Sequence, residues 1–138
     1  MVEKLKVLIM DDDPSRFRQL EGDLCPKRTG VEIFTARTPE EARQILEIED
    51  IGTAFIDRYG PYPELEDLGV PFLMANATRF PETALYLHSS ENDPEVTALL
   101  IGAGAKGFID KSSDPIDYVL AIGFTTEEAR EMGYRGER

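Results

Sequence analysis

The sequence predicts an α/β fold in which a parallel β-sheet is covered by helices on both faces. Short apolar runs and segments with helical spacing alternate five times along the 138 residues, which is the order of parallel strands joined by crossover helices. Several of the apolar runs end in a carboxylate, and several of the helical segments begin with a capping residue and a proline. A chain of this length forms one domain around one continuous core.

The junction after the first apolar run carries most of the functional information. Residues 5–10 are predicted to form a strand, and Asp11, Asp12 and Asp13 follow it directly. Open parallel sheets bind ligands at this carboxyl edge. Two like charges 4 Å apart cost about 4 kcal/mol at an effective dielectric of 20, so a divalent cation is the simplest reason for the cluster. The alternative is that Asp12 or Asp13 caps the helix that follows.

The first half of the chain is predicted to continue with two helices and two strands. Helical spacing of apolar residues predicts a helix over 14–24, and alternation predicts a short strand over 31–35. Residues 38–41 form a capping box, Thr-Pro-Glu-Glu, with proline at the first helical position, so a second helix begins there. The apolar residues 53–57 predict a strand that ends in the carboxylate of Asp57.

The second half is interrupted first by prolines and glycines at positions 60–71, which leave room for a short helix over 71–78. Asn92 or Asp93 caps the next helix, which glycines end. The elements then follow in the same alternation: a strand over 83–88, a helix from 94 to the glycines at 102 and 104, a strand over 107–110 and a helix over 115–122. These elements complete a domain of residues 1–124, and residues 125–138 are expected to add a short polar tail with a helical turn or two.

Composition excludes several classes of function. The chain has 15 basic and 27 acidic residues and a formal charge of −12, which argues against a nucleic-acid-binding surface and favours basic partners or metal cations. Cys25 is the only cysteine, so an intrachain disulfide is impossible. No segment has the length of a signal peptide or a membrane span. We therefore expect a cytoplasmic protein with no nucleic-acid or membrane partner.

Five side chains are predicted to meet at the carboxyl edge of the sheet: Asp11, Asp12, Asp57, Ser89 and Lys111. Magnesium fits the three carboxylates, because it accepts one or two carboxylates together with waters and a phosphate. The lysine and the serine supply a cation and a hydroxyl for a phosphoryl group. Phosphoryl transfer requires positioning and charge neutralisation, and this set of side chains provides both.

Four strings that contain these residues, VLIMDDDP, AFIDRYGP, LYLHSSE and GAKGFIDKS, resemble the receiver domain of two-component response regulators. The resemblance covers the chain roughly to Ile122. It implies a flavodoxin-like fold with strand order 2-1-3-4-5. It also implies a magnesium site at the acidic pair Asp11 and Asp12, completed by Asp57 and the main-chain carbonyl of Tyr59.

The same resemblance implies a role in a phosphorelay. Asp57 would accept a phosphoryl group from a histidine kinase or a phosphotransfer protein. Ser89 would take the hydroxyl role and Lys111 the lysine role that receivers place beside the phosphoacceptor.

The chain departs from the receiver pattern at three places. Phe108 stands where many receivers have a rotating tyrosine, so an aromatic switch at this position has no hydroxyl to bond Ser89. Ser112 stands where proline is usual. Residues 62–71 are richer in proline and glycine than the third helix of the family. The chain therefore resembles a divergent receiver.

Three functions are compatible with these residues. The first is a stand-alone receiver that transfers and removes only its own phosphoryl group and signals to an unknown downstream protein by changing its surface. The second is a phosphatase of the haloacid dehalogenase type, with Asp11 as nucleophile and Asp13, Ser15 and Lys111 completing its motif. The third is a pseudo-receiver, which keeps the fold as an interaction module. The intact set of aspartates and lysine favours the first function.

Two other residues near the strand ends are predicted to have no catalytic role. His88 is the only histidine and precedes Ser89, so it points to the opposite face of its strand and packs in the core or against a helix. Arg58 follows Asp57, and because successive strand side chains diverge, we expect it to be solvated rather than paired with Asp57.

Overall fold

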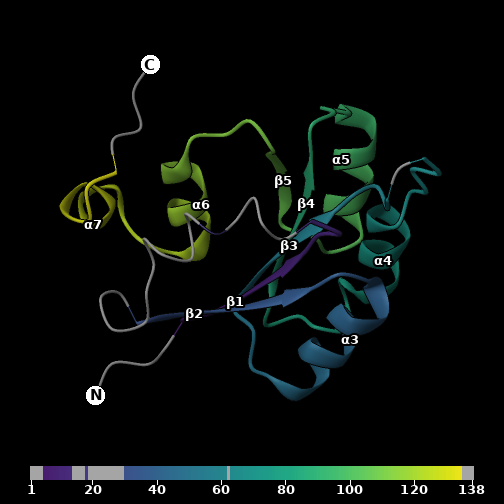
Figure 1. The fold of residues 1–138 in the computed structure, drawn as a ribbon, viewed down its shortest axis with the longest axis horizontal. Helices are drawn as coiled ribbons and strands as arrows, with labels where there is room; N and C mark the ends of the chain where they lie inside the picture. Colours follow the sequence, from purple (N-terminus) through teal and green to yellow (C-terminus); the bar gives the residue numbers. More distant parts are fainter. Residues whose placement is uncertain (1–4, 14–17, 19–29, 62, 135–138) are drawn as a thin grey trace.

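A computed structural model describes residues 5–13, 18, 30–61 and 63–134 and shows a five-stranded sheet (Figure 1). All neighbouring strands are parallel, and their order is β2-β1-β3-β4-β5. The strands are β1 (Leu5–Met10), β2 (Val31–Ala36), β3 (Thr53–Asp57), β4 (Ala84–Ser89) and β5 (Gly107–Asp110). The predicted flavodoxin-like fold class and strand order are therefore confirmed. The expected helix over 14–24, except for Arg18, and Cys25 lie outside the described residues.

Helices cover both faces of the sheet. Figure 1 shows α3, α4 and α5 on one side and α6 and α7 on the other. Their bounds are Pro39–Ile48 for α3, Gly69–Asn76 for α4, Pro94–Gly102 for α5, Pro115–Ile122 for α6 and Thr126–Glu131 for α7. No helix among the described residues is long and apolar enough to cross a membrane.

The strands divide their side chains between two cores. In β1, Leu8 and Met10 contribute to the core beneath α3, α4 and α5, whereas Val7 and Ile9 contribute to the core beneath α6 and α7. This alternation is the period of two residues that a pleated strand imposes. All four side chains are at most 2% exposed, as expected for a strand buried on both faces of a parallel sheet.

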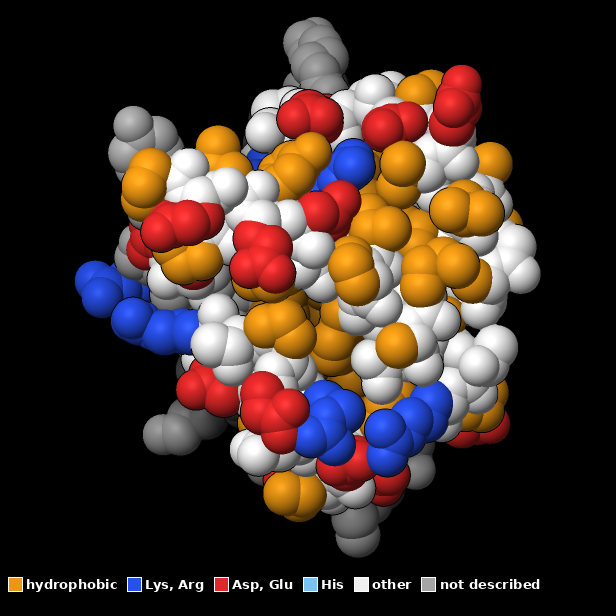
Figure 2. Space-filling model, turned by 90° about the vertical axis from the view of Figure 1, so that its right-hand side faces the viewer, with side chains coloured by type: hydrophobic (Ala, Val, Ile, Leu, Met, Phe, Trp, Pro, Cys, Tyr) orange, Lys and Arg blue, Asp and Glu red, His pale blue; other side chains and the backbone are white. Residues whose placement is uncertain are grey.

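The outer surface of the layer formed by α3, α4 and α5 is partly apolar. Figure 2 faces this side of the molecule and shows hydrophobic side chains gathered over its middle, with charged side chains of both signs around them. The exposed apolar residues of α4 and α5 include Met74, Leu99 and Ile101, which are 42%, 57% and 51% exposed. Helix α5 therefore has apolar side chains beyond the face that it buries at Leu100.

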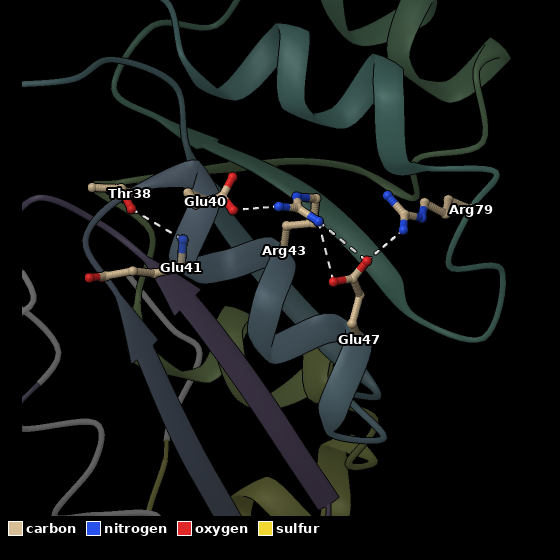
Figure 3. A network of polar contacts seen from close by, with 6 residues as sticks. All are labelled: Thr38, Glu40, Glu41, Arg43, Glu47 and Arg79. Carbon is tan, nitrogen blue, oxygen red and sulfur yellow. Dashed lines mark hydrogen bonds and ion pairs between the residues drawn. The ribbon is translucent and has the colours of Figure 1, made fainter.

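The helix starts follow local capping rules with one variation. Thr38 Oγ1 accepts a hydrogen bond from Glu41 N, as predicted, but the Glu41 carboxylate accepts from Arg37 N, one residue before the cap (Figure 3). Asp93, rather than Asn92, caps α5, because its Oδ1 accepts a hydrogen bond from Val96 N.

Helix α4 starts two residues earlier than predicted, at Gly69. The reason is tertiary: Leu68 N and Gly69 N both donate to the carbonyl of Arg58, at 2.7 and 2.8 Å. The side chain of Asp67 accepts a further hydrogen bond from Val70 N. Strand β4 is also displaced by one residue from the predicted 83–88, because Ala84 pairs with Thr53 and Ser89 pairs with Asp110.

Helix α7 lies within the segment expected to be a polar tail. Its capping box joins Thr125 and Glu128, and the acidic residues Glu127, Glu128 and Glu131 are exposed. Ala129 is fully buried, and Tyr134 is 9% exposed; both belong to the core beneath α6. The segment after 124 therefore contributes to the packing of the domain.

Gly69 provides a test of how closely α4 packs on β3. A Cβ atom at this position would lie 2.5 Å from the carbonyl oxygen of Asp57 and 2.7 Å from Arg58 Cα. Because both atoms belong to the backbone, we expect Gly69→Ala to lower the free energy of unfolding by about 2 kcal/mol or more. Urea denaturation measures this change.

Gly102→Ala is the matched control, because a Cβ atom at Gly102 meets nothing within 4 Å. It should raise the free energy of unfolding by about 0.5 kcal/mol through the better helix propensity of alanine. Equal stabilities of the two variants would contradict the close approach at Gly69.

Candidate functional site

A cleft of about 590 Å³ lies at the carboxyl edge of the sheet. The loops after β1, β3, β4 and β5 form its walls, which is the position where open α/β sheets bind ligands. Its lining residues are Asp12, Asp57, Tyr59, Gly60, Leu65, Ser90, Glu91 and Lys111. Three of the five side chains predicted at this edge thus line the cleft, and Asp11 and Ser89 lie buried beside it.

Three carboxylates converge at the cleft. Asp11, Asp12 and Asp57 each offer an oxygen, and the three oxygens lie within 4.8 Å of one another. Asp11 is 1% and Asp57 4% exposed, and Asp12 is more accessible. Asp11 Oδ1 accepts a hydrogen bond of 2.9 Å from Asp13 N, which orients its carboxylate.

This donor set fits a hard divalent cation. Carboxylate oxygens are the ligands that magnesium prefers, and the partly open position of Asp12 leaves room for the waters that magnesium retains. Within the described part of the chain, these aspartates are the one group of three or more His, Cys, Asp or Glu side chains that can hold a metal ion.

Lys111 contacts the predicted phosphoacceptor directly. Its Nζ atom lies 2.7 Å from Asp57 Oδ1, and the two side chains are 18% and 5% exposed. Lys111 N also donates to the carbonyl of Ser89, which fixes the end of β5 against the end of β4. A largely buried ion pair of this length keeps one oxygen of Asp57 occupied.

Ser89 and Phe108 lie beside the cleft rather than in its lining. Ser89 is 2% exposed, and its Oγ accepts a hydrogen bond of 3.1 Å from Glu91 N. Phe108 is half-buried and packs against the core beneath α3, α4 and α5. In the strand ladder Phe108 pairs with Leu87, two residues before Ser89.

Asp110 holds the turn after β5 through two hydrogen bonds from Ser112. Both the backbone amide and the hydroxyl of Ser112 donate to Asp110 Oδ1, at 2.8 and 2.7 Å. These hydrogen bonds lower the pKa of the Asp110 carboxyl. The turn that presents Lys111 is therefore held by a local side-chain bond.

Tyr59 forms one wall of the cleft. Its hydroxyl donates to Glu91 Oε1 at 3.5 Å, so the loop after β3 touches the loop after β4. Burial raises the pKa of the Tyr59 hydroxyl, Arg58 opposes this shift and Glu91 adds to it. The guanidinium of Arg58 lies 5.1 Å from the centre of the Tyr59 ring, within the range of a cation–π contact.

The prediction that Arg58 is solvated is wrong. Its side chain is 11% exposed, its Nε donates to Asp67 Oδ2 at 3.1 Å, and its Nη1 lies 3.7 Å from Asp93 Oδ2. Burial lowers the pKa of the guanidinium, but the hydrogen bond and the charge of Asp67 outweigh it, so the pKa is raised above the ordinary value. The chain returns after Pro61 and pairs Asp67 with Tyr59 in an antiparallel bridge, which brings the acid to Arg58.

Sequence reasoning missed the role of Asp67. The usable signal was that Asp67 stands three residues before Val70 and can accept a hydrogen bond from its amide in the first turn of α4. Asp67 lies, however, in a stretch dominated by proline and glycine. The prediction for His88 is confirmed, because this residue is 1% exposed and its Nε2 lies 2.6 Å from the hydroxyl of Tyr118 on α6.

The sequence matches no protein-family model and no curated protein sequence. The structure is similar to that of a CheY-like response regulator receiver domain from Methanospirillum hungatei, with a TM-score of 0.72 and 23% identity over 94% of this chain and 97% of that one. It is similar to a two-component response regulator from Clostridium difficile, with a TM-score of 0.72 and 16% identity over 95% and 100% of the two chains.

Chemotaxis protein CheY4 of Vibrio cholerae is a further similar structure, with a TM-score of 0.69 and 23% identity over 85% of this chain and 94% of that one. The chain therefore has the fold of response regulator receiver domains. The predicted resemblance to a divergent receiver is confirmed at the level of the fold.

The convergence of the three carboxylates predicts how Asp12→Ala changes stability. Without divalent cations the variant should be as stable as the wild type or more stable, because a like charge is removed from the cluster. Millimolar Mg²⁺ should raise the free energy of unfolding of the wild type by about 1 kcal/mol and leave the variant unchanged, since only a folded site binds the ion. Urea denaturation with and without magnesium measures both effects.

Asp13→Ala is the control for this experiment, because the Asp13 side chain lies outside the group of three converging carboxylates. Magnesium should stabilise this variant as it does the wild type. An equal magnesium response in Asp12→Ala and the wild type would rule out the site.

Proposed function

We propose that the chain is a phosphoryl-accepting receiver domain. In this proposal Asp57 takes a phosphoryl group from a histidine kinase or a phosphotransfer protein, with Mg²⁺ as cofactor, and the domain signals by binding a downstream protein. The observation that carries the proposal is the environment of Asp57: a 4% exposed carboxylate with Lys111 Nζ at 2.7 Å on one side and the oxygens of Asp11 and Asp12 within 4.8 Å on the other.

The proposed ligands of the magnesium ion are the carboxylates of Asp12 and Asp57 and the main-chain carbonyl of Tyr59, with Asp11 acting through a water. When bound, magnesium supplies positive charge to the oxygens of the transferring phosphoryl group. The chain's own contribution is to hold these oxygens at one point on a rigid sheet edge, where no reorganisation is needed during the reaction.

The transfer itself requires one nucleophile and a donor that carries its own leaving group. A carboxylate oxygen of Asp57 forms a bond to phosphorus as the bond between phosphorus and the donor nitrogen breaks, and the nitrogen leaves with its electron pair. Lys111 then exchanges the Asp57 carboxylate for the new phosphoryl oxygens, and the Ser89 hydroxyl donates to another of them. Phe108 would follow Ser89 by packing alone, because it has no hydroxyl.

The dehalogenase-type function has less support in this geometry. It requires Asp11 as the attacking group, but Asp57 lines the cleft and Asp11 lies buried beside it. The lysine that would serve such a reaction forms its ion pair with Asp57. The formal net charge of the chain, −12, favours partners with a basic docking face.

The nucleophile is tested by the position of the covalent label. After incubation with acetyl phosphate and magnesium, borohydride trapping and peptide mapping should place the label on Asp57, and Asp57→Asn should remain unlabelled. The protein should not hydrolyse aryl phosphates steadily, because water attack on an acyl phosphate is slow without a placed general base.

Two results would overturn this assignment. A label on Asp11 together with sustained phosphatase turnover would establish the dehalogenase-type reaction. No label with acetyl phosphate or with phosphorylated histidine donors would identify a pseudo-receiver.

Lys111→Ala tests the step that follows transfer. We expect Asp57 to retain part of its phosphorylation while the conformational response is lost, because the lysine charge is what pairs with the new phosphoryl oxygens. Lys111→Arg should restore the response only in part, since a planar guanidinium replaces a point charge. Amide hydrogen exchange of β5 and α6 measures the response, and equal changes in the wild type and Lys111→Ala would exclude this role.

A further inference from the structure

The side chain of Arg58 connects three segments beside the cleft. Its guanidinium donates to Asp67 just ahead of α4, approaches Asp93 at the start of α5, and lies over the ring of Tyr59 in the cleft wall. The side chain of Arg58 is 11% exposed, whereas those of Asp67 and Asp93 are 34% and 39% exposed, so these ion pairs are only partly shielded from solvent and from salt. Arg58 is also the residue directly after Asp57.

The two aspartates divide their oxygens in the same way. Oδ1 of Asp67 accepts from Val70 N in the first turn of α4, and Oδ1 of Asp93 accepts from Val96 N in the first turn of α5. In each carboxylate, Oδ2 faces Arg58. Each helix start therefore has a capping bond of its own, and the guanidinium is what joins the two starts to each other.

The backbone of Arg58 is fixed as firmly as its side chain. Its amide donates to the carbonyl of His88 at 3.1 Å, and its carbonyl accepts from Leu68 N and Gly69 N. Gly69 lies so close that a Cβ atom would come within 2.5 Å of the Asp57 carbonyl oxygen. No space between Asp57 and Gly69 can accommodate a displacement of the backbone at Asp57. Such a displacement therefore moves the start of α4.

We propose that Arg58 is a positioning residue that holds the segment from Asp57 to Gly60 in place and couples the state of Asp57 to the first turns of both α4 and α5. This inference rests on the proposed function, because it assigns the route by which phosphorylation of Asp57 reaches two helices of one layer. A guanidinium suits the role, since it donates from Nε to Asp67 and at the same time places Nη1 3.7 Å from Asp93, whereas an ammonium is a single point charge.

The coupling has a direct electrostatic consequence. Without the guanidinium, the carboxylates of Asp67 and Asp93 lose their shared cation, and their mutual repulsion favours separation of the two helix starts. The Tyr59 ring also loses its cation, so the carbonyl proposed as a magnesium ligand is less well positioned. Loss of such supporting contacts typically weakens metal binding by about tenfold or more.

The test uses the variant Arg58→Met, which keeps the length of the side chain without its charge. This variant is compared with four other proteins. They are the wild type, Arg58→Lys, Asp93→Asn and the control Arg79→Met. Arg79 also pairs with an acid, Glu47 on α3, but it lies beyond the far end of α4 and is 52% exposed (Figure 3). Its removal deletes an arginine ion pair to α3 without touching the cleft.

Each protein is titrated with magnesium and then treated with acetyl phosphate. The label on Asp57 and the amide hydrogen exchange of residues 67–72 and 93–97 are measured in the same samples. In the wild type and Arg79→Met, phosphorylation should change exchange in both segments. In Arg58→Met, Asp57 should still be labelled, magnesium should bind about tenfold more weakly, and the response of residues 93–97 should be lost. Arg58→Lys should restore it in part.

Asp93→Asn keeps the inference testable if Arg58→Met does not fold. Asparagine caps helices as well as aspartate does, so α5 should remain formed while its response to phosphorylation is lost and that of residues 67–72 is kept. Full responses of both segments in Arg58→Met or in Asp93→Asn would overturn the coupling and leave the proposed function standing. Absence of the label on Asp57 in the wild type would overturn the proposed function and the coupling together.

Discussion

The parallel register of four strands is the constraint on which the site depends. Met10 pairs with Ile56, Asp57 with His88, and Ser89 with Asp110, so the ends of β1, β3, β4 and β5 lie within two residues of one level. A slip of one residue in any pair would move every side chain of that strand to the other face and would break both cores. The apolar alternation that builds the two cores therefore also sets where the polar side chains meet.

The convergence of acidic side chains at the sheet edge has an electrostatic cost, and neighbouring cations reduce it. Asp11 and Asp57 are buried carboxylates, and Asp67 and Asp93 add two further acids at the neighbouring helix starts. Two cations pair with different members of this set of acids. Lys111 contacts Asp57 itself, whereas Arg58 is turned toward the helix starts and leaves the cleft to the carboxylates. The edge thus holds a cluster suited to binding a cation beside a second cluster that already contains one, the guanidinium of Arg58.

The two layers are attached to the site by different chemistry. On one side, α4 and α5 reach the end of β3 through charged and backbone hydrogen bonds at Arg58. On the other side, α6 reaches β4 through the buried hydrogen bond between Tyr118 and His88 and through their edge-to-face contact with centroids 5.5 Å apart.

The sequence predicts those parts of the molecule whose causes are local. The apolar runs and the carboxylates that end them identify the strands, and Thr38, Asp93 and the prolines that follow them identify the starts of α3 and α5. The edge residues follow from the strand ends alone. By contrast, the start of α4 and the burial of Arg58 depend on the return of the chain after Pro61, which no local pattern specifies.

Gly69 has a consequence for the evolution of this chain. Any side chain at this position would collide with the backbone on either side of the Asp57–Arg58 peptide bond. Position 69 is therefore restricted to glycine as long as α4 packs this closely on β3. A substitution at this position therefore shifts α4 relative to the end of β3, whatever the chemistry of the new side chain.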